Sequence, residues 1–242
     1  MTKKIVNNKR LETVANNYLK PNSTFSVDAR LISIMADVVK DLIKGPNVLE
    51  MGVGANEYTA IIIKKFDHSY IVDFSHKLLN QAQKRYGDNI TTFFSSFENF
   101  KPDILFDTVL ATNVLEHVEN PIQVLKKIKT WIKKDGKVLI NVPNANSLHR
   151  IYGVCLGLLK KNTDLSQADK QIGHKRVYIM EKLEKDIQKA GLRVVSKRPT
   201  FIKLFSNSQM KDFSDSQLIG LYKLAKFLPL EFNSTLFYVC SI

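Results

Sequence analysis

The sequence predicts an α/β fold, in which helices cover both faces of a doubly wound, mostly parallel sheet. Short apolar runs alternate with segments of helical periodicity from residue 47 to residue 195. A glycine-containing turn follows the first apolar run, and an acidic residue ends the second. Such alternation is typical of βαβ units, whose strands run parallel and are buried on both faces.

Residues 1–44 are expected to be helical. Apolar residues recur at helical spacing from Leu11 to Tyr18. A second helix is predicted from Ser26, as its N-cap, to Leu42, and Gly45-Pro46 ends it. Because these helices precede the first strand, we expect them to form a lid or flank of the sheet.

The first strand is predicted at residues 47–49 and runs into the turn Gly52-Val53-Gly54. Glycines permit positive φ angles and let a ligand approach the backbone, so the turn is typical of a nucleotide-type cofactor site. The dinucleotide pattern G-x-G-x-x-G is incomplete, because Glu57 replaces its last glycine. A carboxylate there would repel a pyrophosphate. S-adenosylmethionine (SAM), which has an adenosine but no phosphates, fits better.

The strand–helix alternation then continues. Further strands are expected at 70–72, 90–94, 106–111 and 137–142, with helices at 57–66, at 76–86 and after Pro121, and a turn at Asp135-Gly136. Asp73 ends the second strand, 21 residues after Gly52. A carboxylate at this position can accept hydrogen bonds from both ribose hydroxyls of a cofactor.

Residues 144–178 interrupt the alternation directly after the fifth strand, and long insertions of this kind are usually lids or substrate-binding segments. A helix at 180–190, a strand at 192–195, a helical stretch at about 215–227 and a strand at 235–240 should follow. We therefore expect one domain over residues 1–242: an N-terminal helical lid (1–44), a cofactor-binding core (45–143), a substrate lid (144–178) and C-terminal helices and strands (179–242).

Composition indicates a soluble globular protein, with 44% hydrophobic and 24% charged residues. The longest apolar run, residues 151–159, is too short to span a bilayer, and no targeting signal is evident at either end. Two cysteines without metal-ligand spacing suggest a reducing compartment, so a cytoplasmic location is expected. The net charge of +13 indicates either an anionic partner or a general enrichment in lysine.

Five segments together resemble the class I SAM-dependent methyltransferases. They are VLEMGVGANE, YIVDFS, FDTVLATNVLEHVENP, KKDGKVLINVPN and GHKRVYIMEKLEKDIQKAGLRVV, which span residues 47–196 in the order and spacing of that family. The resemblance implies a Rossmann-like, seven-stranded sheet whose last strand is antiparallel, with a helical insertion after strand five. It also implies SAM over the ends of strands one and two. The chain resembles the small-molecule methyltransferases of surface-polysaccharide and natural-product pathways.

The resemblance also implies a set of cofactor-binding residues. By position, Glu50, Gly52 and Gly54 resemble the methionine-binding loop, Asp73 the ribose-binding acid, Phe74, Ser96 and Phe97 the adenine pocket, and Asn113 a residue beside the sulfonium. Two positions depart from the family pattern. Asn56 replaces the third loop glycine, although asparagine tolerates positive φ. The usual adenine-binding Asp after strand three is absent, so Ser95, Ser96 or Glu98 must serve.

Glu116-His117 follows strand four, and His174 lies at the end of the insertion. Methyl transfer to a hydroxyl or amine needs a proton acceptor, and a histidine of ordinary pKa suits that role. His117 and His174 are therefore the candidate bases, with Glu116 beside them. If the insertion folds over the strand ends, His149 should converge on the same pocket.

The insertion is basic and includes aromatic residues. His149, Arg150, Tyr152, Lys175, Arg176 and Tyr178 are the candidate substrate-binding residues, and they suit an anionic substrate, phosphorylated or carbohydrate-like. A solvated basic face is the alternative.

Two other functions remain open. An RNA 2′-O-methyltransferase is one, because the Glu116-His117 and His174 layout resembles metal-assisted enzymes of that class. Nucleic acid is the less favoured partner, because no RNA-binding module or basic-aromatic tract is evident. We predict no metal ligand, because Asn113 replaces the first acid of that motif. The other alternative is a SAM-binding protein without catalysis. The oligomeric state is not predicted.

Overall fold

The computed structural model describes residues 25–54 and 57–242. A seven-stranded sheet has the strand order β3-β2-β1-β4-β5-β7-β6, and only β7 runs antiparallel to its neighbours. The strands are β1 (Val48–Met51), β2 (Ser69–Asp73), β3 (Ile90–Phe94), β4 (Phe106–Thr112), β5 (Ile132–Pro143), β6 (Arg193–Arg198) and β7 (Thr235–Ser241). The predicted fold class is confirmed. The expected helix at 11–18 and Asn56 lie outside the described residues.

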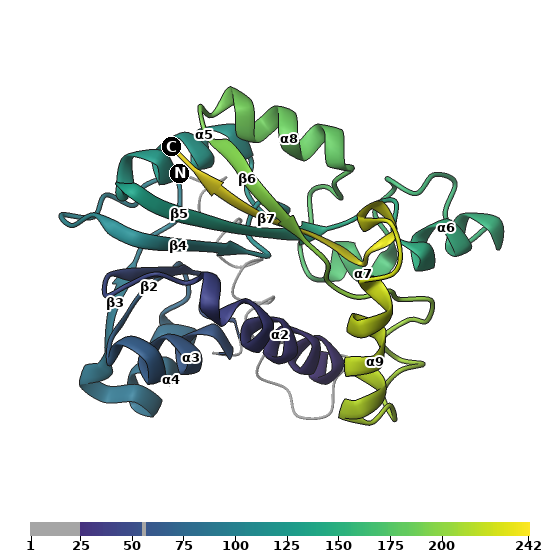
Figure 1. Ribbon diagram of the computed structural model, residues 1–242, viewed down its shortest axis with the longest axis horizontal. Coiled ribbons are helices and arrows are strands. Elements are labelled where there is room, and N and C mark those ends of the chain that lie inside the picture. The colour runs from purple at the N-terminus through teal and green to yellow at the C-terminus, as the bar shows by residue number, and fades with distance from the viewer. Residues whose placement is uncertain (1–24, 55–56) are drawn as a thin grey trace, which may run out of the picture.

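Helices cover both faces of this sheet (Figure 1). On one face lie α2 (Phe25–Val39), α3 (Glu57–Phe66) and α4 (His76–Tyr86), and on the other α5 (Pro121–Trp131) and α8 (Met180–Lys189). Short 3-10 helices follow α2 (η1, Lys40–Leu42) and α4 (η2, Gly87–Asn89), and another precedes β7 (η3, Leu230–Phe232). Helix α2 begins at Phe25, so Ser26 lies in its first turn and is not its N-cap.

Alternate residues of the central strands build separate cores on the two faces. Val109 of β4 packs in the cluster that contains Leu125 of α5, whereas its neighbour Leu110 packs with Tyr58 and Ile62 of α3. Successive side chains of a strand point to opposite faces, so a continuous apolar run is required where both faces are buried. The central strands are therefore fixed rigidly, with their carboxyl ends at one edge.

Strand β5 differs from the sequence prediction. It begins at Ile132 instead of Lys137, and Asp135-Gly136 lies inside it where a turn was expected. Four residues of β5 lie opposite one residue of β4 between the pairs Phe106–Ile132 and Thr108–Lys137, so the turn-forming dipeptide lies in a bulge. A Cβ atom on Gly136 would lie 2.4 Å from Cγ1 of Ile132, which explains the glycine there.

The insertion after β5 contains two short helices, α6 (Leu148–Cys155) and α7 (Gln167–Gln171). With α9 (Asp215–Ala225), they lie at the end of the molecule away from β3 (Figure 1). Asn144 joins the start of the insertion to η3, because its side-chain amide donates to the carbonyls of Glu231 and Asn233. Within the described ranges, no helix is long and apolar enough to cross a membrane.

Candidate active site

The turn after β1 has the backbone that its glycines allow. Gly52 and Gly54 have φ angles of 79° and 50°, a region that side chains with a Cβ atom rarely adopt. The amide of Gly52 donates to the carbonyl of Val72 at 2.8 Å, which ties the turn to the end of β2. The turn therefore lies between two strand ends, with Phe97 packed close to Gly52.

Asp73 links the same two strand ends through its side chain. Its carboxylate is buried and accepts hydrogen bonds from the amides of Val53 (3.0 Å) and Ser75 (2.7 Å). Each carboxylate oxygen has a second lone pair, so Asp73 can also accept ribose hydroxyls. The predicted ribose-binding acid thus also holds the glycine turn in place.

Glu50 is the penultimate residue of β1 and is buried, and no cation among the described residues contributes to the shift of its pKa. Its carboxyl group is buried and accepts a hydrogen bond from the Thr59 hydroxyl of α3. Burial raises the pKa of Glu50 to about 8, although the bond from Thr59 lowers it, and the nearby Glu57 and Asp73 raise it further. An uncompensated acid at this point is suited to a cationic ligand group, such as the ammonium of a bound amino acid moiety.

The expected adenine-binding residues lie at the ends of β2 and β3. Phe74 and Ser96 are partly buried, and the carbonyl of Ser96 accepts from the amides of Asn99 and Phe100. Phe97 is buried in the core cluster on the α5 face. Asn113, after β4, has a φ of 56°, and its side chain accepts from the amide of Asn141 at 3.3 Å. Their contact with a cofactor stays a prediction.

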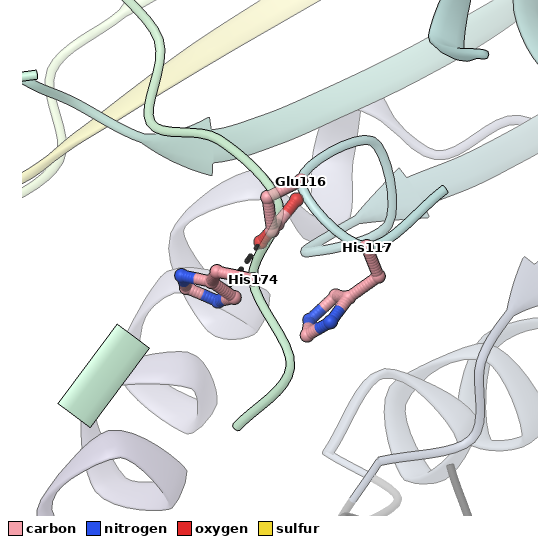
Figure 2. A group of neighbouring side chains, drawn as sticks. All are labelled: Glu116, His117 and His174. Carbon is pink, nitrogen blue, oxygen red and sulfur yellow. Dashed lines mark ion pairs between the residues drawn. The ribbon is translucent and has the colours of Figure 1, made fainter. Parts of the chain in front are cut away.

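Glu116, His117 and His174 form a cluster beyond the end of β4 (Figure 2). The Glu116 carboxylate points at the ring of His174, with 4.0 Å between Oε1 and Nε2. The rings of His117 and His174 meet edge to face, with centroids 4.8 Å apart. Glu116 and His174 are buried and His117 is partly buried. Both predicted bases and the acid therefore meet.

Burial changes the proton affinity of two members of this cluster. It raises the pKa of Glu116 to about 7, an effect that the charge of His174 opposes. Burial and then the charge of His174 lower the pKa of His117 to about 3. The expectation of an ordinary pKa for His117 was therefore wrong, because its ring is largely removed from water. Burial therefore brings the pKa of Glu116 close to neutral pH.

Asp169 of α7 contacts His174 at Nδ1, the ring nitrogen that does not face Glu116. Its Oδ1 atom lies 3.0 Å from Nδ1 of His174, and its Oδ2 atom accepts from Arg150 (2.9 Å) and from the Ser166 amide and hydroxyl. Together with the bond to His174, these bonds hold the pKa of Asp169 well below its usual range, although burial alone would raise it. The sequence alone does not indicate this role of Asp169. Ser166 and Asp169 form a capping box, and that signal marks a helix start without revealing the histidine.

Several predicted substrate-binding residues have partners within the chain. Arg150 is buried and also donates to the carbonyls of Asn162 and Asp164. Arg176 donates to the carbonyls of Leu115, Val118 and Glu119, and Lys175 pairs with Glu119. Tyr178 is buried in the core, and Tyr152 is exposed. The guanidinium groups of Arg150 and Arg176 thus stabilise the backbone around the site instead of facing a substrate.

Among the described residues, no hydrogen bond, ion pair or ring contact joins His149 to the cluster. Of the three histidines that were expected to converge, only His117 and His174 meet. Its Nδ1 atom is buried without a hydrogen-bond partner. Burial, followed by the charges of Lys203 and Arg150, lowers the pKa of His149 to about 3. The charges that lower this pKa are therefore those of Lys203 and Arg150, and not those of the Glu116–His117–His174 cluster.

A metal ion is a possible occupant of the Glu116–His117–His174 cluster. The three donor atoms lie within 4.8 Å of one another. Ligands about 2.1 Å from a tetrahedral metal lie about 3.4 Å apart, so the cluster would have to contract. The expectation that the site works without a metal stays a prediction.

Comparison with known proteins gives one family match and several more distant relatives. Residues 26–197 match a family described as "Methyltransferase domain". The chain is 25% identical over 130 residues to (S)-coclaurine N-methyltransferase of Thalictrum flavum subsp. glaucum, which covers 51% of this chain and 36% of the relative. It is 23% identical over 169 residues to ubiquinone biosynthesis O-methyltransferase of Rickettsia prowazekii, covering 64% and 67%. The chain spans only about a third of the plant relatives it matches.

Solved structures share the fold at low sequence identity. The structure of 1,6-didemethyltoxoflavin-N1-methyltransferase from Burkholderia thailandensis, with bound 1,6-didemethyltoxoflavin and S-adenosylhomocysteine, superimposes with a TM-score of 0.63. The two sequences are 13% identical, and the superposition covers 98% of this chain and 88% of the other chain. The methyltransferase CcbJ from Streptomyces caelestis gives a TM-score of 0.64 at 13% identity, covering 96% and 97%.

Proposed function

The chain belongs to the methyltransferase domain family, and we propose that it transfers a methyl group from SAM to an oxygen or nitrogen atom of a small metabolite. The family match confirms the predicted class of enzyme and its cofactor. The acceptor, the substrate and the residue roles given below are parts of the proposal.

One observation supports the proposed place of methyl transfer, which the family match alone does not give. The cluster of Glu116, His117 and His174 lies just beyond β4, and Glu116 follows three residues after Asn113, the residue expected beside the sulfonium. When bound, SAM supplies an electrophilic methyl group. The chain must hold the acceptor in line with that group, and positioning accounts for much of such a rate enhancement.

The same cluster can take the proton that the acceptor loses. His174 is the better placed of the two candidate bases, because the Asp169 carboxylate supports a positive charge on its ring. His117 lines the partly exposed side of the cluster and orients the acceptor. At the other end of the site, Asp73 and Glu50 are proposed to hold the ribose and the ammonium of SAM.

An anionic substrate is supported by charge alone. The net charge is +13, and the insertion carries exposed lysines at 160, 161 and 170. Arg150 and Arg176, the guanidinium groups best suited to a phosphate or carboxylate, already have partners in the chain. We therefore propose that an anionic part of the substrate is bound by the exposed lysines, at a distance from the acceptor atom.

The test is a transfer assay with methyl-tritiated SAM. Purified protein is incubated with a metabolite extract or with total RNA, and the label is counted in each. Label in the metabolite fraction, lost in His174→Ala, supports the proposal. Label in RNA would support the alternative function. If SAH binds but no label moves to either fraction, the protein is a SAM-binding protein without this activity.

A further inference from the structure

His174 is held in one tautomer by its contact with Asp169. A carboxylate only accepts hydrogen bonds, so the proton of the 3.0 Å contact must lie on Nδ1 of His174. Arg150 and Ser166 donate to the other carboxylate oxygen and keep Asp169 in place. A neutral His174 therefore presents the bare lone pair of Nε2 to the cluster, and this atom faces Glu116 (Figure 2).

Glu116 presents acceptors toward the same space. Its side chain is fully buried, and neither carboxylate oxygen has a hydrogen-bond partner in another residue among those described. Oε1 and Nε2 of His174 lie 4.0 Å apart, too far for a hydrogen bond. The two acceptors, Oε1 of Glu116 and Nε2 of His174, therefore face each other, and no described residue places a hydrogen-bond donor between them. Buried polar groups without a partner cost free energy, so a donor at this place would be favourable.

The lysine and arginine side chains near the cluster, among the residues that the structure describes, do not supply that donor. Lys175 pairs with Glu119, and the Arg176 guanidinium donates to the carbonyls of Leu115 and Val118. His117 contacts His174 through its ring edge and not through an ion pair with Glu116. With His174 neutral and Glu116 ionised, no described residue donates between them, and a bound molecule can supply that donor.

We propose that the group methylated by this protein is an amine, whose N–H groups are received by Glu116 and Nε2 of His174. This inference rests on the proposed function and narrows it from oxygen or nitrogen to nitrogen. A hydroxyl offers one donor and no charge. An ammonium offers three donors and a positive charge, so it satisfies both acceptors and compensates the buried carboxylate.

The reaction then balances. The bound ammonium gives one proton to the Glu116–His174 pair and becomes a neutral amine. Its lone pair forms the N–C bond while the C–S bond breaks, and the bond electrons return to sulfur as a thioether. The N-methylated product leaves as an ammonium, and the proton held by the pair passes to water.

Sinefungin is a suitable probe, because it carries an amine-bearing carbon in place of the methyl sulfonium of SAM. Its ammonium projects toward the acceptor side of the site, whereas SAH has no group there. Isothermal titration measures the affinity of both compounds for the wild type, for Glu116→Gln and for the matched control Glu119→Gln. Glu119 is exposed on the same loop. EDTA is present throughout, so that no metal ion occupies the cluster.

We expect the wild type and Glu119→Gln to bind sinefungin about tenfold or more tighter than SAH, as one charge-assisted hydrogen bond implies. In Glu116→Gln that preference should disappear while the SAH affinity is unchanged, which also shows that the variant is folded. Equal affinities in the wild type, or a preference that survives Glu116→Gln, would overturn the amine receptor. Failure of SAH itself to bind would instead contradict the proposed function.

Discussion

The Oδ1 atom of Asp169 lies 3.0 Å from Nδ1 of His174, and the other oxygen of this carboxylate lies 2.9 Å from the Arg150 guanidinium. All three side chains are nearly buried. The charged pair of Arg150 and Asp169 therefore joins α6 to α7 within the insertion and holds His174 in position.

Removal of one partner of this pair should be costly. Arg150→Met leaves the Asp169 carboxylate buried without its cation, so we expect a loss of about 3–5 kcal/mol in the free energy of unfolding. Urea denaturation followed by circular dichroism measures it. The control is Asp215→Asn, which breaks the surface pair with Arg30 and should cost less than about 1 kcal/mol. Similar losses in the two variants would show that the Arg150–Asp169 pair is not a structural support.

Glu50 should make stability depend on pH. The folded state keeps the Glu50 proton until about pH 8, whereas the unfolded chain loses it near pH 4.5. Between these values the folded state binds more protons, so this contribution is complete below pH 4.5 and is lost as the pH rises to 8. Glu50→Gln should therefore gain stability over the wild type as the pH rises from 5 to 8. Urea midpoints at each pH test this, and a constant difference would contradict it.

Asp73→Asn should weaken cofactor binding. The asparagine amide turns two donor hydrogens toward a place where the amides of Val53 and Ser75 also donate. We expect the affinity for SAH to fall by about tenfold or more, with a loss of about 1–3 kcal/mol in stability. Calorimetric titration gives the affinity, and Asp88→Asn on the exposed turn after α4 is the control. An unchanged affinity for SAH would contradict the assignment of the ribose site.

Arg176 should determine the order of the loop that carries the cluster. Its guanidinium donates to Leu115 at 2.6 Å, Val118 at 2.5 Å and Glu119 at 3.1 Å, a fork that the single ammonium of lysine cannot reproduce. Arg176→Lys should therefore speed amide hydrogen exchange in residues 114–120 and lower the rate of transfer. Lys175→Met, which removes only the exposed pair with Glu119, should leave exchange nearly unchanged. Equal exchange in both variants would be evidence against this role.

The sequence predicts the sheet well because its signals are local. Continuous apolar runs such as that of β4 identify strands buried on both faces, and Asp73 was found from its distance to Gly52. The bulge in β5 was not predicted, because Asp135-Gly136 has the composition of a turn and only the pairing with β4 keeps it extended.

The site was predicted less completely, because side-chain partners depend on tertiary contacts. The sequence predicts the meeting of Glu116, His117 and His174 on the condition that the insertion folds over the strand ends. The sequence does not show that Arg150 and Arg176 have partners within the chain, because it gives the charge of a residue but not the tertiary contacts that pair it. The role of Asp169 is not evident from the sequence either, because its contact with His174 depends on how the chain folds after α7, although the two residues are only five positions apart.

A structure of the protein with SAH bound tests the central claim most directly. We expect the ribose hydroxyls to bond to Asp73, the sulfur to lie beside Asn113, and open space to connect the sulfur with Glu116 and His174. A ribose placed away from Asp73, or a sulfur separated from Glu116 and His174 by packed side chains, would contradict the proposed site of methyl transfer.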